Sequence, residues 1–215
     1  MATVKSRARR RPPKQADEVD GGEKFRRRLL EAMADSIAEH GYAKATVAEI
    51  VGRARTSRRT FYQYFADREA CYVALLTQNN AEMVRRITEA VDPLAPWHVQ
   101  VRQAVDAWIT AAESRPAVML SWIRDAPGLG AQARRLQREF MEAFAVMVQS
   151  LTDSEQLLAT GVRPVSWQRV IMLLGGLHEL TAWTLERGGR MSDIAEEAYD
   201  LALALLGPQQ QRTSD

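Results

Sequence analysis

The most constraining feature of the sequence is a four-residue recurrence of apolar side chains, segment after segment, from about residue 23 almost to the C-terminus. In the first segment Phe25, Leu29, Met33 and Ile37 follow one another at this spacing, which places them on one side of a helix. No stretch alternates between apolar and polar residues for long enough to form a strand. The sequence therefore predicts an all-α fold.

Capping residues and glycine mark the ends of the first helices. Gly41 is a stop signal for the first, and Thr46 with Glu49 three residues later forms a capping box for a short second helix. Ser57 and Asp67 are the corresponding N-caps of a short third helix and of a long fourth one. The short turn between the second and third helices predicts a helix-turn-helix.

The rest of the chain predicts further helices, separated by proline and glycine. Their expected ranges are residues 97–114, 116–125, 130–151, 166–186 and 192–206. The predicted organisation is a disordered basic arm (1–22), an N-terminal helix-turn-helix DNA-binding domain (23–68), a larger C-terminal helical ligand-binding and dimerisation domain (69–207) and a disordered tail (208–215).

Charge is distributed unevenly. Residues 1–68 contain 16 Lys and Arg against 9 Asp and Glu, whereas residues 69–215 contain 13 against 18. This asymmetry indicates that the N-terminal third meets a polyanion. Five of its basic residues lie between Arg7 and Lys14, and two interpretations of this arm stay open. It either enters a minor groove beside the helix-turn-helix, or it is a tail attracted to any polyanion.

The stretch TSRRTFYQYF forms the predicted third helix. Phe61 and Phe65 are four residues apart and are expected in the core of the helix-turn-helix. The other faces carry Arg58, Arg59, Thr60, Tyr62, Gln63 and Tyr64. A solvated cationic face is the alternative interpretation, but the preceding helix and the basic surroundings favour contact with DNA.

The segment FRRRLLEAMADSIAEHGYAKATVAEIVGRARTSRRTFYQYFADREACYVALL resembles the N-terminal domain of TetR-family transcriptional regulators. The resemblance implies that Thr46 holds a phosphate, and that Arg68, where the family usually has lysine, touches another. It implies further roles in DNA recognition for Arg58, Arg59, Thr60 and Gln63 in the major groove and for Tyr62 and Tyr64 on the backbone. Arg55 departs from the family pattern because it occupies the usual turn glycine; a positive φ there costs about 1 kcal/mol.

The resemblance also implies that the last two helices pair with their copies in a homodimer. On the penultimate helix the apolar stripe includes Ile171 and surrounds Gly175-Gly176. The predicted interface consists of Val170, Leu174, Leu177, Thr181, Ala198, Leu201 and Leu205. Core packing within one protomer is the alternative for these residues.

A ligand pocket among the middle helices is implied as well. The predicted lining is Trp108, Met119, Trp122, Phe140, Phe144, Met147, Met172, His178 and Trp183. Met and Trp adapt to irregular shapes, so this set fits a wide cavity for a small hydrophobic ligand, or else a filled core. His178 is then either a polar contact or a structural residue.

Other classes of protein find no support in the sequence. No apolar run approaches the ~20 residues that cross a bilayer, so no membrane partner is expected. One cysteine, Cys71, rules out an intrachain disulfide and fits a cytoplasmic protein. His178-Glu179 begins like a zinc-protease motif, but Ala182 stands where the second ligand belongs, so no metal, cofactor or enzyme activity is predicted.

The resulting prediction is a homodimeric transcriptional regulator that binds double-stranded DNA. It is expected to be a repressor, released from a palindromic operator by a small hydrophobic ligand. The alternatives are a ligand-independent architectural DNA-binding protein and a regulator controlled by a protein partner.

Overall fold

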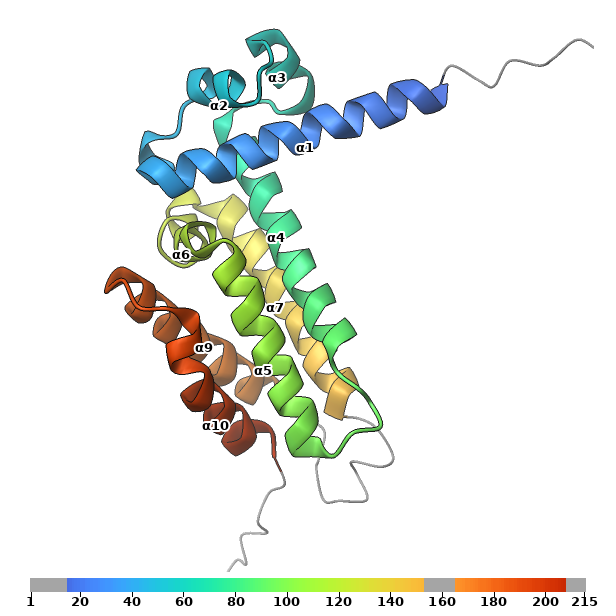
Figure 1. The fold of residues 1–215 in the computed structure, drawn as a ribbon, viewed down its shortest axis with the longest axis vertical. Helices are drawn as coiled ribbons and strands as arrows, with labels where there is room; N and C mark the ends of the chain where they lie inside the picture. Colours follow the sequence, from blue (N-terminus) through green and yellow to red (C-terminus); the bar gives the residue numbers. More distant parts are fainter. Residues whose placement is uncertain (1–14, 153–164, 208–215) are drawn as a thin grey trace, which may run out of the picture.

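The computed structural model describes residues 15–152 and 165–207, and every regular element in them is helical (Figure 1). The all-α prediction is confirmed. The elements are α1 (Gln15–His40), η1 (Tyr42–Lys44), α2 (Val47–Arg53), α3 (Arg58–Tyr64), α4 (Arg68–Ala90), α5 (Trp97–Ser114), α6 (Pro116–Arg124), η2 (Ala126–Leu129), α7 (Ala131–Thr152), α9 (Trp167–Glu186), η3 (Met191–Ile194) and α10 (Ala195–Leu206).

The first helix begins earlier than the sequence predicts. It starts at Gln15 rather than near Glu23 and runs through Gly21 and Gly22, which belong to the arm (1–22) that the sequence predicts as disordered. A glycine inside a helix costs roughly 0.5–1 kcal/mol but does not by itself end the helix. Gly22 lies against α3, since a Cβ built there would be 3.5 Å from Tyr64 Oη. The basic residues from Arg7 to Lys14 and the tail 208–215 lie outside the described residues.

The predicted caps are present. Gly41, with φ of 77°, follows the end of α1. The side chain of Thr46 accepts a hydrogen bond from the Glu49 backbone N–H at 3.2 Å, and that of Ser57 accepts one from the Thr60 N–H at 3.0 Å. These side chains satisfy N–H groups that a helix leaves without partners in its first turn. Local sequence therefore sets the boundaries of α2 and α3.

The three N-terminal helices bury a common apolar core. Leu29, Met33, Ile50 and Phe61 are completely buried there. Phe25 was predicted to continue the same stripe, but 38% of its surface is exposed, and the Arg28 guanidinium lies over its ring. The core thus begins one helical turn after Phe25.

The remaining helices form the body of the molecule. In Figure 1, α4, α5 and α7 run along its long axis, and α9 and α10 lie against them. Helix α4 belongs to both parts, because it packs on α1 as well as on α5 and α7. Helix α6 packs on α1 at one side and on α9 at the other. In residues 15–152 and 165–207 no helix is long and apolar enough to span a membrane.

Candidate nucleic-acid interface and ligand cavity

Helix α3 has one apolar side and one polar side. Phe61 and Phe65 face the core and hold the helix against α1 and α2. The residues that are open to solvent are Arg58, Arg59, Tyr62 and Gln63, and Thr60 and Tyr64 are half-buried. Figure 1 places α3 at the end of the molecule remote from α10. The predicted recognition residues therefore form a cationic face that projects from one end of the protein.

The threonines of this region are tied into the caps and keep exposed hydroxyl groups. Thr46 is exposed at the start of α2, and Thr60 Oγ1 lies 2.9 Å from Ser57 Oγ. The Thr46 hydroxyl, which accepts in its cap, can also donate to a neighbouring acceptor, and the Thr60 hydroxyl can do so when Ser57 Oγ donates to it. Both groups are thus placed where a phosphate or base edge could receive a hydrogen bond.

The turn before α3 holds Arg55 in the left-handed region, with φ of 47°. The positive φ considered from the sequence is therefore present. Arg28 on α1 donates to the Ala54 carbonyl and, at 3.2 Å, to the Arg55 carbonyl. These charge-assisted hydrogen bonds offset the strain of a non-glycine residue at this φ. The Arg55 side chain itself is exposed beside α3.

Arg68, for which a phosphate contact is predicted, also makes contacts within the protein. Its guanidinium donates to the carbonyl groups of Tyr42 at 3.1 Å and Ala45 at 2.9 Å, and it lies over the Tyr42 ring at 4.4 Å. The side chain is turned towards the η1 turn, and it bonds protein carbonyls. Its effect in this geometry is to hold the turn before α2 against the start of α4.

A stacked pair of tyrosines connects this turn with α6. The Tyr42 and Tyr72 rings are 3.8 Å apart and nearly parallel. Tyr72 Oη lies 2.7 Å from Ser121 Oγ, and Ser121 Oγ donates to Asp125 at 2.7 Å. Burial raises the pKa of Tyr72, so the phenol stays protonated and able to donate. This series of contacts joins the helix-turn-helix to the middle of the body.

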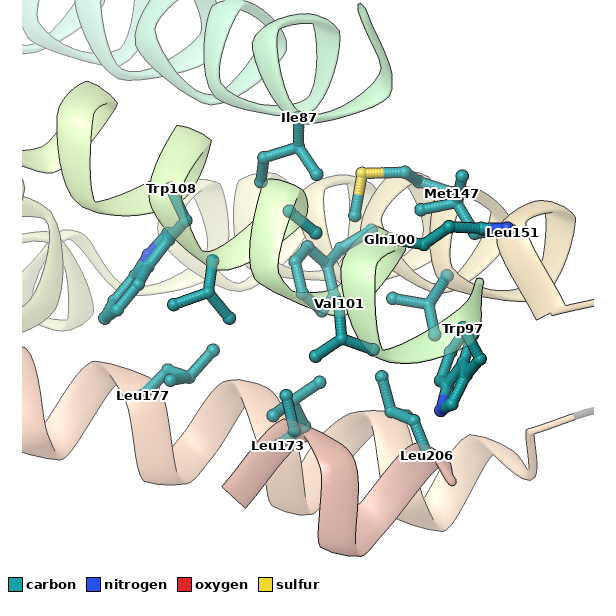
Figure 2. A pocket seen from close by; sticks show the side chains of 15 residues that line it. Ile87, Trp97, Gln100, Val101, Trp108, Met147, Leu151, Leu173, Leu177 and Leu206 are labelled. Atoms are coloured by element: carbon teal, nitrogen blue, oxygen red, sulfur yellow. The ribbon is translucent and has the colours of Figure 1, made fainter. Parts of the chain in front are cut away.

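The body contains an apolar cavity of about 60 Å³ enclosed by helices α4, α5, α7, α9 and α10. Figure 2 shows Trp108 and Trp97 towards opposite ends of this space, with Val101 and Leu173 between them. Gln100, which also lines it, donates its amide to the carbonyls of Pro93 and Ala95. Such a volume holds a few water molecules, so the body is closer to the filled-core alternative than to a wide pocket.

A second, smaller cavity of about 10 Å³ adjoins the first, because both are lined by Trp108, Phe144 and Leu177. Seven of the nine predicted lining residues touch one cavity or the other: Trp108, Met119, Trp122, Phe140, Phe144, Met147 and His178. Met172 and Trp183 do not, because 54% and 51% of their surfaces face solvent. The prediction was wrong for these two, since they lie on the outer side of α9.

Sequence reasoning missed Asn80, a buried residue of α4 that lines the smaller cavity. It stands in the apolar stripe of its helix, four residues after Leu76 and three before Met83. A polar residue at such a position is the signal that would have identified it.

Comparison with known proteins agrees with this geometry. Residues 29–75 match the family model described as "Bacterial regulatory proteins, tetR family". The uncharacterized HTH-type transcriptional regulator YdgC of Bacillus subtilis is 37% identical over 70 residues, which are 33% of this chain and 35% of that relative. Residues 29–75 are therefore a helix-turn-helix segment of the TetR-family type.

Solved structures show that the TetR-like fold extends beyond the matched segment. The fatty acid degradation regulator FadR of Bacillus halodurans superposes with a TM-score of 0.73 at 17% identity, over 87% of this chain and 97% of its own. FadR of Bacillus subtilis, solved in complex with stearoyl-CoA, gives 0.71 at 14% identity, over 86% and 99%. The sequence match to YdgC spans about a third of that relative, whereas the fold match spans nearly all of each FadR chain.

The matched segment is the DNA-binding part of transcriptional regulators, and the chain's own cysteine shows no sign of reactivity. This one cysteine, Cys71, is completely buried, and burial raises the pKa of the thiol to about 12. The thiol is therefore protonated and enclosed, as expected of a core residue.

The outer surface of α9 is a further unusual feature of the molecule. Its large apolar side chains that are open to solvent are Trp167, Ile171, Met172 and Trp183. Gly175 lies between them, and a Cβ added there would have no neighbouring atom within 4 Å, whereas a Cβ at Gly176 would meet Leu201 of α10 at 3.2 Å. Gly176 thus permits contact within the protomer, and Gly175 leaves the outer surface open.

Most of the predicted dimer interface lies on the opposite side of these helices. Val170, Leu174, Leu177, Thr181 and Ala198 are buried in the protomer, and Leu201 and Leu205 are partly buried. The alternative of core packing is therefore correct for the five buried residues, because a side chain enclosed by its own protomer has no surface left for a partner.

Proposed function

We propose that this TetR-family protein is a homodimeric repressor that binds a palindromic operator and is released from it by a small hydrophobic ligand. The observation that carries the proposal is the outer face of α3, where Arg58, Arg59 and Gln63 are exposed over a rigid apolar core. Donors held this way on a short helix suit the edges of bases in a major groove.

The proposed DNA-binding unit is residues 23–68, together with the earlier turns of α1. Arg58, Arg59, Thr60 and Gln63 are assigned to bases, and Thr46, Tyr62 and Tyr64 to the phosphate backbone. Arg68 is assigned a supporting role, because its guanidinium bonds the carbonyls of η1. It orients Thr46 and α2 rather than touching DNA through its own charge.

The proposed dimer forms through the outer face of α9, in the helical body of residues 69–207. A palindromic operator presents two half-sites about 34–36 Å apart, so two copies of α3 are needed. Trp167, Ile171 and Trp183 supply the kind of aromatic and aliphatic surface found at the centre of homodimer interfaces. Gly175 allows the backbone of a second α9 to approach closely.

The ligand is assigned to the two adjoining cavities of the body. Their linings are almost entirely apolar, and FadR of Bacillus subtilis, a structural neighbour, was solved with stearoyl-CoA. A ligand of that kind needs more room than about 60 Å³, so its binding must separate α4 from α5, α7 or α9. Because α4 begins at Arg68 beside the helix-turn-helix, this movement changes the spacing of the two α3 helices.

The test uses fluorescence anisotropy with a duplex obtained by selection from random DNA. Two protomers are expected per duplex, and a hydrophobic ligand is expected to weaken binding by about 5–150-fold, the usual range of allosteric coupling. Stearoyl-CoA and shorter acyl-CoA esters are the first ligands to add. Equal affinity for the duplex with every ligand, including those that bind the protein, would contradict regulation by a ligand.

A further inference from the structure

Asn80 is a buried polar side chain whose amide nitrogen has no partner within the described residues. Only 7% of its surface is accessible, and its amide nitrogen makes no hydrogen bond within the described chain. A buried amide without a partner destabilises a folded protein, and such groups are rare in native interiors. Asn80 lines the cavity of about 10 Å³, which is about the least volume that holds one water molecule.

His178 is the second polar side chain of the same cavity. Its ring stacks on Phe140, with centroids 6.1 Å apart and planes 11° from parallel, and burial lowers its pKa to about 4. The imidazole is therefore neutral near pH 7 and carries one N–H donor. Within the described residues, no side chain or backbone group forms a hydrogen bond to this ring.

The charge of the surroundings limits what these two groups can recognise. Neither cavity has Lys, Arg, Asp or Glu among its described lining residues. A carboxylate in this place would lose its hydration without gaining a cation, which is costly in an apolar interior. An uncharged oxygen, in contrast, needs one or two donors, and Asn80 with His178 provides them.

We propose that Asn80 and His178 form the polar recognition point of the ligand cavity, selecting an apolar molecule that carries an uncharged carbonyl oxygen, as in a ketone, ester or thioester. The inference rests on the proposed function, in which the cavity takes a hydrophobic ligand. The apolar part of the molecule extends from Trp108 into the larger cavity, and its carbonyl accepts hydrogen bonds at the smaller one.

This arrangement also gives the ligand a direct connection to the DNA-binding unit. Asn80 lies on α4, whereas His178 lies on α9. A carbonyl bonded to both side chains fixes α4 relative to α9 once the cavity has widened. The ligand therefore discriminates between two positions of α4, as a coupling between ligand and operator requires.

The experiment measures binding of three matched series to the full chain by isothermal titration calorimetry. The probes are 2-ketones of seven to thirteen carbons, alkanes of equal carbon number and the corresponding straight-chain carboxylates. The wild type is expected to bind the best ketone about tenfold more tightly than its alkane, and more tightly than its carboxylate. In Asn80→Leu and His178→Phe the preference for ketone over alkane is expected to fall to about twofold, with alkane affinity retained. The second variant keeps the ring that stacks on Phe140.

The outcomes separate this inference from the proposed function. If alkanes and ketones bind the wild type equally, or if both variants keep the tenfold preference, Asn80 and His178 do not recognise the carbonyl. The cavity would still be the proposed ligand site. Tighter binding of carboxylates also overturns it. If none of the probes binds, both the recognition point and the proposed ligand site fail. Thermal unfolding of Asn80→Leu serves as the folding control, since removal of an unpartnered amide is expected to leave stability unchanged or raise it.

Discussion

Helices α3 and α9 both expose aromatic side chains, but the side chains around them differ. On α3 the exposed Tyr62 stands among Arg58, Arg59 and Gln63. On α9 the exposed Trp167 and Trp183 are accompanied by aliphatic residues and an open glycine. An aromatic ring beside cations and an amide suits a polyanion, whereas rings beside aliphatic groups suit another protein surface. Exposure alone therefore does not define a surface; the neighbouring side chains do.

The inner faces of the same two helices differ as well. Helix α3 presents Phe61 and Phe65 to a tightly filled core. Helix α9 presents Leu177 and His178 to small cavities. The first arrangement suits the proposed DNA-reading face, and the second suits the proposed binding of a ligand between the helices.

The largest expected effect concerns the outer face of α9. Ile171→Glu places a charge at the centre of the proposed dimer interface, where it would lose its hydration without a partner. We expect a monomer in sedimentation velocity and a loss of operator affinity of more than about 100-fold, because one protomer meets only one half-site. Val146→Glu is the matched control, since Val146 is 65% exposed on α7. A dimeric Ile171→Glu protein would show that the copies pair elsewhere.

The second prediction concerns His178 on the inner face of α9. Burial lowers its pKa to about 4, below the value of about 6.5 in an unfolded chain. The unfolded state therefore binds the proton more readily, and the stability present above pH 6.5 is lost as the pH falls. The loss attributable to His178 is about 3 kcal/mol at pH 4. Urea unfolding of wild type and His178→Phe gives the free energy of unfolding at each pH from 7 to 4, and the wild type is expected to lose more of it as the pH falls. Parallel plots of this free energy against pH would contradict the burial of a neutral imidazole.

A smaller effect is expected on the outer face of α3. Arg59→Ala should weaken operator binding by about 5–150-fold, because a side chain contacting a base contributes about 1–3 kcal/mol. Arg138→Ala removes the same charge from an exposed position on α7 and is expected to change affinity less than twofold. Anisotropy titrations at one salt concentration compare the two. Equal losses would mean that total charge, rather than the position of Arg59, determines binding.

The smallest effect tests the turn that positions α3. Arg55→Gly removes a side chain from a residue with φ of 47° and is expected to raise the free energy of unfolding by up to about 1 kcal/mol. Arg55→Ala retains the strained φ and is expected to leave stability nearly unchanged. Thermal or urea unfolding distinguishes them. Identical stabilities of the two variants would show that the left-handed φ at this turn costs no measurable free energy.

Sequence predicted those features that depend on a few adjacent residues. Thr46 and Ser57 mark the starts of α2 and α3 because a cap is a contact across three residues. The side of α9 that faces a partner was not predicted, since this helix is apolar on both sides: Val170 and Leu174 point inward and Ile171 points outward. Periodicity identifies a helix but does not show which of two apolar faces is buried in the protomer.

The directions of long side chains and of isolated polar groups also escaped prediction. Arg68 reaches carbonyls that are 23 and 26 residues away in sequence, a contact that no local pattern encodes. Asn80 becomes informative only when the fold shows that its amide nitrogen is buried beside a cavity and has no partner within the described residues. For the same reason Met172 and Trp183, which resemble pocket residues in sequence, lie outside the body.

The most direct test of the proposed DNA-reading dimer is selection of random duplex DNA by the purified full chain at about 0.2 M salt, where non-specific attraction is weakened. We expect recovery of one palindromic sequence, with two half-sites a helical turn or slightly more apart and with two protomers bound. Recovery of unrelated sequences would contradict this expectation. In that case Arg58, Arg59, Thr60 and Gln63 would not read bases, and the basic N-terminal third would act as a general clamp for polyanions.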